Sequence, residues 1–110
     1  MYTYRAKVNR VVDGDTFDVT IDLGFGAFLK QRLRLARVDT PEVRGEERPE
    51  GLKAKEFVEL WFGKWDGEII VKTTKERGKY GRYIAEVASP EDENLSDLLL
   101  AEGLAEEYKG

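Results

Sequence analysis

One arginine and two carboxylates fall within residues 34–42, and together they could act on a phosphate. Arg34 lies near the end of a segment that alternates apolar and polar residues, and Asp39 and Glu42 follow it closely. Carboxylate oxygens suit hard cations such as calcium or magnesium. A guanidinium donates two parallel hydrogen bonds to phosphate oxygens. This segment is therefore a candidate site for a metal ion and a phosphate.

The same segment also fits a purely structural role, as a strand that ends and leads into a helix. Thr40 would then cap the following turn, and Pro41 is a common residue in a first helical turn. Arg34 and Asp39 are five positions apart, so on a straight strand their side chains would face opposite sides. We expect the chain to bend near Val38 if the two residues share a site.

The motif Asp13-Gly14-Asp15-Thr16 interrupts the first alternating segment and also allows two interpretations. Asp-Gly is a common turn pair, and aspartate readily caps backbone groups. Alternatively, two carboxylates separated by one glycine can approach the same cation, because glycine lets the backbone bend tightly. The motif alone leaves both interpretations open.

A third motif, Lys79-Tyr80-Gly81-Arg82, combines two cations with a glycine and an aromatic residue. Charged, glycine-containing segments are ordinary hairpin turns. In the functional interpretation, Arg82 would hold a phosphate, and Lys79 and Tyr80 would lie near the substrate.

The composition limits the chemistry that this chain could perform. Its 110 residues include no cysteine and no histidine, which excludes disulfides, zinc–thiolate sites, histidine metal sites and triads that need histidine. The length suits one domain. No apolar run approaches the roughly 18 residues of a membrane span, and the N-terminus lacks a signal-peptide core. We therefore expect a cytoplasmic location, unless the chain was trimmed from a secreted precursor.

The charge is distributed unevenly along the chain. The net charge is -4, which is unlike that of a strongly basic nucleic-acid binder. Residues 1–45, however, contain eight Lys and Arg against six Asp and Glu, whereas residues 46–110 contain ten against sixteen. The cationic excess therefore lies in the part that holds the first two motifs.

Alternation and turn residues predict five strands and two helices. The strands are expected over residues 2–12, 16–23, 28–38, 68–74 and 83–88. The helices are expected over residues 52–62, ended by Gly63, and 95–102, capped by Asn94 and ended by Gly103. This order predicts a mainly β (α+β) fold, a five-stranded antiparallel OB-fold barrel with a helix between strands three and four, in one domain spanning residues 1–110.

Taken together and in this order, the three motifs resemble the staphylococcal nuclease (thermonuclease) family. The resemblance covers residues 12–103 and is carried by Val12-Asp-Gly-Asp-Thr16, Arg34-x-x-x-Val38-Asp-Thr-Pro-Glu42 and Lys79-Tyr-Gly-Arg82. It implies an OB-fold and a calcium-dependent endonuclease that hydrolyses phosphodiester bonds of DNA and RNA. The implied leaving group is the 5′-oxygen, which leaves 3′-phosphate ends.

Carried over motif by motif, the resemblance also implies a role for each site residue. The implied ligands of one calcium ion are Asp15, Asp39 and the backbone carbonyl of Thr40. Asp13 would lie just outside these ligands. The implied catalytic residues are Arg34, Glu42 and Arg82. The implied substrate contacts are Lys79 and Tyr80.

Two other functions stay open: an OB-fold module that binds single strands or a protein partner without cleaving, and a calcium-binding structural domain. The set of acids and arginines favours the nuclease, since a pure binding module does not need it. The loop at residues 46–50 carries glutamates where a basic family member has lysines, and this weakens the expected substrate affinity. The expected partners are DNA and RNA, preferably single-stranded, bound by a monomer that has no membrane contact.

Overall fold

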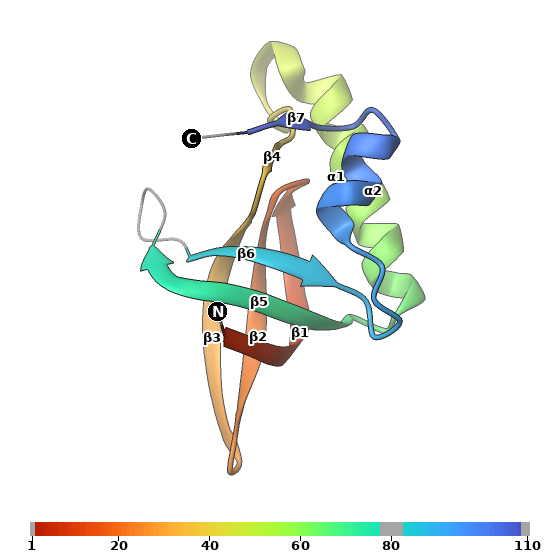
Figure 1. Ribbon diagram of the computed structural model, residues 1–110. Coiled ribbons are helices and arrows are strands. Elements are labelled where there is room, and N and C mark those ends of the chain that lie inside the picture. The colour runs from red at the N-terminus through yellow and green to blue at the C-terminus, as the bar shows by residue number, and fades with distance from the viewer. Residues whose placement is uncertain (1, 78–82, 109–110) are drawn as a thin grey trace.

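The alternating apolar residues of the first three strands form one wall of a closed β-barrel (Figure 1). The computed structural model describes residues 2–77 and 83–108. It contains β1 (Tyr2–Asp13), β2 (Thr16–Gly24) and β3 (Ala27–Leu35), with β1 paired to β2 and β2 paired to β3 in antiparallel register. Phe17 and Val19 of β2 are fully buried, as their alternation predicts. The expected β2–β3 hairpin is confirmed.

Two later strands close the barrel, which runs in the order β1-β2-β3-β6-β5. β5 (Glu68–Arg77) pairs antiparallel with β1 and with β6 (Tyr83–Ala88). β6 pairs with β3 in parallel. The predicted barrel is confirmed, and this one parallel pair differs from the expected antiparallel arrangement. The reason is geometric, because an odd number of strands cannot alternate in direction all the way round a closed ring.

Helix α1 (Arg48–Lys64) lies in the chain between the first three barrel strands and β5, and it packs against the core of the barrel. Its buried side chains include Val58, Trp61 and Phe62, and the Phe62 ring meets that of Phe17 edge to face at 5.1 Å between centroids. The helix begins before the expected start at residue 52, because Pro49 lies in its first turn, where proline fits well. It also continues past Gly63, the expected stop.

Helix α2 (Leu95–Ala101) packs against β6 (Figure 1). The predicted cap is confirmed, since the Asn94 side chain accepts a hydrogen bond of 2.9 Å from the Asp97 amide. Gly103, with a φ of 70°, follows the helix, as expected for a C-terminal stop. Neither helix of the described residues is long and apolar enough to cross a membrane.

The predicted third strand does not continue to residue 38. It breaks after Leu35, and a two-residue strand, β4 (Val38–Asp39), follows a turn. β4 pairs with β7 (Glu106–Glu107) in a small second sheet, and the 3-10 helix η1 (Gly45–Glu47) leads into α1. The break matters because the candidate site residues lie on both sides of it.

Candidate active site

A bend between β3 and β4 brings Arg34 and Asp39 together. Arg37 lies in the bend with a left-handed φ of 69°, which redirects the chain. The Arg34 guanidinium spans the bend, because its Nη1 donates to the carbonyls of Leu35 at 3.0 Å and Val38 at 2.8 Å. Its Nη2 donates to Asp39 Oδ1 at 3.3 Å. The bend expected from the spacing of these residues is confirmed.

The Asp15 side chain reaches the same place from the β1–β2 turn. Thr16 is the register partner of Arg34, so the start of β2 lies beside the end of β3. Asp15 Oδ2 accepts the backbone N–H of Thr40 at 3.0 Å and lies 3.3 Å from Arg34 Nη1. Asp15, Arg34, Asp39 and Thr40 therefore form one cluster, called the acid–arginine cluster below, from two distant parts of the sequence.

This cluster carries two carboxylates against one guanidinium, so it has an excess negative charge. Burial raises the pKa of Asp39 above its usual value, the neighbouring Asp15 carboxylate raises it further, and Arg34 opposes both. The Asp15 side chain is only 9% exposed, whereas that of Asp39 is 60% exposed. The open side of the cluster is therefore at Asp39, and a second cation there would relieve the repulsion between the carboxylates.

The atoms of the cluster that could bind a metal ion are the oxygens of Asp15, Asp39 and Thr40, which fits a hard cation such as calcium. The buried Thr40 hydroxyl has no hydrogen-bond partner within the described residues. A cavity of about 180 Å³ lies against Asp39 and Thr40 and is lined on its other side by Gly103 to Glu106. No group of three or more Asp, Glu, His or Cys side chains suited to a metal occurs within residues 2–77 and 83–108. Water and substrate oxygens would therefore supply most of a calcium shell of six to eight oxygens.

The loop that carries Glu42 is held in place by two contacts that the sequence did not indicate. Gly51 of α1 lies so close to this loop that a Cβ atom there would overlap the Glu42 carbonyl. The Asp13 carboxylate accepts the Val43 N–H at 3.4 Å. The Glu42 side chain itself is exposed. Asp13 thus contacts the loop from outside the acid–arginine cluster.

Arg37 fixes the bend through its side chain, a role that sequence reasoning missed. Its guanidinium donates twice to the Glu86 carboxylate, and also to Asn94 Oδ1 at 3.2 Å and Asp97 Oδ1 at 3.0 Å. These bonds, above all those to Glu86, raise the pKa of Arg37 above its usual value. The bend is therefore tied to β6 and α2. No local sequence signal links an arginine to partners so far along the chain.

The end of the described chain lies against Arg34. The Tyr108 N–H donates to the Arg37 carbonyl at 2.8 Å, and the Tyr108 ring lies 5.1 Å from the Arg34 guanidinium carbon. A guanidinium on an aromatic face gains a cation–π attraction. Arg34 is thus held by carbonyls, carboxylates and a ring. The predicted site residues Lys79, Tyr80 and Arg82 lie outside the described residues.

The barrel, its helices and the acid–arginine cluster at a strand end define an OB-fold protein with a candidate site for a cation and an anion. The sequence profile of the family described as staphylococcal nuclease homologue matches residues 32–110. The chain therefore belongs to this family. The match includes Arg34, Asp39 and Glu42, and it begins after Asp15.

Two curated relatives have similar sequences over nearly the whole chain. They are proteins named "Uncharacterized endonuclease" from Escherichia coli O157:H7 and from Escherichia coli. Each is 25% identical over 112 residues, which cover 94% of this chain and 60% of the relative. The chain thus spans about 60% of the length of the relatives that it matches.

Proposed function

We propose that this protein is a calcium-dependent endonuclease that hydrolyses phosphodiester bonds of DNA and RNA. The observation that carries the proposal is the position of the Arg34 guanidinium, 3.3 Å from the Asp15 carboxylate and 3.3 Å from the Asp39 carboxylate. Membership of the staphylococcal nuclease family and the endonuclease names of the relatives support it. Single strands are the preferred substrates, and the protein acts as a monomer.

One calcium ion would be held by Asp15, Asp39 and the backbone carbonyl of Thr40. When bound, calcium supplies positive charge that polarises a phosphate oxygen and lowers the pKa of water. Arg34 donates to the phosphate from a fixed direction, since the Leu35 and Val38 carbonyls restrain its guanidinium. A donor aimed at developing transition-state charge contributes roughly 3 to 4 kcal/mol. Arg82 supplies the second guanidinium in this proposal.

Glu42 takes the proton of the attacking water or holds that water in line, and the 5′-oxygen leaves to give a 3′-phosphate end. A general base contributes about 10²- to 10⁴-fold to the rate. Gly51 and Asp13 support this role because they fix the backbone of the loop on which Glu42 lies. Lys79 and Tyr80 contact the substrate near the scissile phosphate.

The second candidate function is a module that binds single strands or a protein partner without cleavage. The net charge of -4 and the acidic loop at residues 46–50 favour it, because they weaken attraction for phosphates. The acid–arginine cluster distinguishes the two functions, since backbone binding needs cations and has no use for a buried carboxylate such as Asp15.

Cleavage of a labelled single-stranded DNA in calcium, in magnesium and in EDTA tests the proposal, with Arg82→Ala as the matched variant. We expect cleavage in calcium, none in EDTA, and a rate at least about 10²-fold lower for Arg82→Ala. Equal cleavage in EDTA or by the variant would overturn the nuclease proposal. Binding without cleavage in either metal would establish the second function.

A further inference from the structure

β3 carries a row of side chains on its outer face that runs from Arg34 toward the tip of the β2–β3 hairpin. Arg32, Lys30 and Phe28 occupy the successive alternate positions after Arg34. Leu33, which lies between the first two, is buried in the barrel, so the pleat places the row outside. Alternate residues of such a strand lie about 6.8 Å apart, a spacing close to that of consecutive phosphates in an extended single strand.

The cations of this row line a surface hollow. A cavity of about 420 Å³ is bordered by Lys30, Arg32 and, from β1, Arg10. In the part of the chain that the structure describes, Asp18 is the one carboxylate that borders it, and both of its oxygens accept hydrogen bonds from Arg32, at 2.8 Å and 3.1 Å. Within the described residues, neither Arg10 nor Lys30 forms an ion pair. This local positive charge contrasts with the net charge of -4 of the whole chain.

Exposed aromatic rings extend the row beyond the cations. Phe28 is 64% exposed and Phe25, in the hairpin turn, is fully exposed. Figure 1 shows that this hairpin projects well past the rest of the barrel, away from the helices. Cations that follow a backbone, combined with aromatic faces for bases, are the features that bind single-stranded nucleic acids without sequence preference.

We propose that Arg32, Lys30 and Phe28, called the outer β3 row, bind the part of a single-stranded nucleic acid that continues from the phosphate at Arg34. The two cations contact consecutive phosphates, and the Phe28 ring stacks on a base. The row thus gives the substrate a second contact region along the barrel, outside the cleavage site. This inference rests on the proposed function for the identity of the ligand, a single-stranded nucleic acid. The positions of the three side chains do not depend on whether the protein cleaves that ligand.

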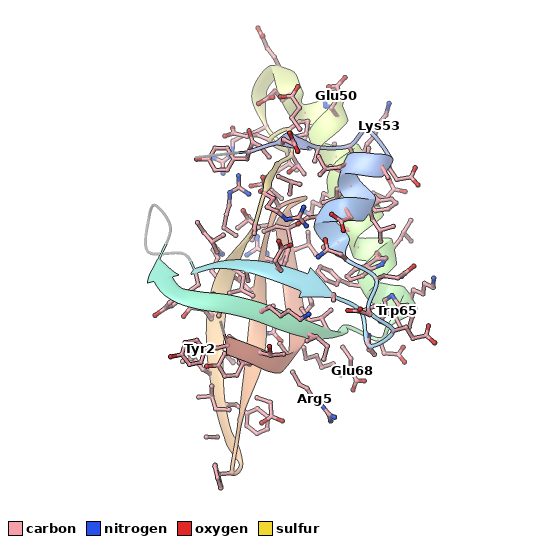
Figure 2. The ribbon with its side chains drawn as sticks, in the orientation of Figure 1. Tyr2, Arg5, Glu50, Lys53, Trp65 and Glu68 are labelled. Carbon is pink, nitrogen blue, oxygen red and sulfur yellow. The ribbon has the colours of Figure 1, made fainter. Side chains whose placement is uncertain are left out.

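Fluorescence anisotropy of a labelled single-stranded DNA of about 15 nucleotides, in EDTA, tests this row without cleavage. The test variant combines Lys30→Gln and Phe28→Ala, both at exposed positions. Lys53→Gln is the matched charge control, because Lys53 lies on α1 at the end of the molecule opposite the hairpin (Figure 2). We expect the double variant to bind at least about tenfold more weakly. The slope of log affinity against log salt should fall by about 0.7 for the lost phosphate contact.

The possible outcomes separate this inference from the proposed function. If the double variant and Lys53→Gln bind the DNA with equal affinity, the proposed role of the outer β3 row is wrong, even if the wild type cleaves DNA. No binding by the wild type at low salt would overturn it as well. Weaker binding by the double variant with an unchanged salt slope would overturn the proposed contact between Lys30 and a phosphate. Binding through the row without cleavage in any metal would support the row and contradict the proposed nuclease. Thermal unfolding at the wild-type temperature verifies that the double variant is folded.

Discussion

At the scale of single residues, Arg34 differs from an ordinary surface arginine because both terminal nitrogens of its guanidinium form hydrogen bonds within the protein. Two carbonyls, two carboxylates and the Tyr108 ring surround it, and its side chain is only 12% exposed. A planar fork suits this arrangement, whereas an ammonium is a point charge with no fixed plane. The geometry therefore predicts that a positive charge alone at position 34 is insufficient for catalysis.

Replacement of Arg34 by lysine tests this prediction. Arg34→Lys keeps the positive charge but loses the fixed direction, so we expect kcat on single-stranded DNA to fall by about 10²-fold or more with a small change in KM. Arg5→Lys, at an exposed position of β1 far from the cluster (Figure 2), is the control and should retain full activity. A kcat for Arg34→Lys within a factor of about three of the wild type would show that the fork geometry has no catalytic role.

At the scale of secondary structure, the bend between β3 and β4 is the element on which the site depends. Arg37 lies there in a left-handed conformation that costs a residue with a side chain about 1 kcal/mol or more. Its bonds to Glu86, Asn94 and Asp97 offset that cost. The side chain of Arg37 therefore stabilises the bend in which the Arg37 backbone is strained.

Two substitutions at Arg37 separate these backbone and side-chain effects. Arg37→Ala loses the bonds and keeps the unfavourable φ, whereas Arg37→Gly loses the bonds and relieves φ. We expect the free energy of unfolding to be about 1 kcal/mol higher for Arg37→Gly than for Arg37→Ala, and lower for both than for the wild type. Urea denaturation measures this order, and its reversal would show that the φ at this position costs nothing.

The contact between α1 and the Glu42 loop gives a second prediction at this scale. Alanine normally stabilises an exposed helix interior by about 0.5 to 1 kcal/mol relative to glycine. A Cβ at Gly51 would instead overlap the Glu42 carbonyl, while at Gly63, in the same helix, it would meet nothing within 4 Å. We expect Gly51→Ala to lower both stability and kcat, and Gly63→Ala to leave kcat unchanged without loss of stability. Equal behaviour of the two variants in urea denaturation and cleavage assays would contradict the loop contact.

The sequence alone predicted the strands, the helices and the need for a bend, because these depend on local alternation and on the parity between Arg34 and Asp39. The parallel β3–β6 pair was missed, since strand direction follows from closure of the whole ring. The β4–β7 pairing and the Arg37 contacts join residues far apart in sequence, and two-residue strands carry no periodicity. Tertiary contacts of this kind leave no local pattern to read.

At the scale of the whole molecule, the charge distribution differs between the outer β3 row and the acid–arginine cluster. The chain is acidic overall, yet its cationic excess lies in residues 1–45, where the outer β3 row leads to Arg34. The row ends at the acid–arginine cluster, in which two carboxylates outnumber one guanidinium. The phosphates of a bound strand would lie along the cations of the row and then meet the carboxylates of the cluster. This arrangement would allow cleavage only if a metal ion neutralises the carboxylates.

The rate of single-stranded DNA cleavage as a function of free calcium, for the wild type and Asp39→Asn, tests most directly whether these carboxylates hold a catalytic cation. We expect the wild-type rate to rise to saturation with calcium and to return after EDTA treatment when calcium is restored. Removal of one carboxylate charge should raise the half-saturating calcium concentration at least about tenfold, since ligand charge sets calcium affinity. An unchanged calcium dependence in Asp39→Asn, or full wild-type activity in EDTA, would contradict the central claim.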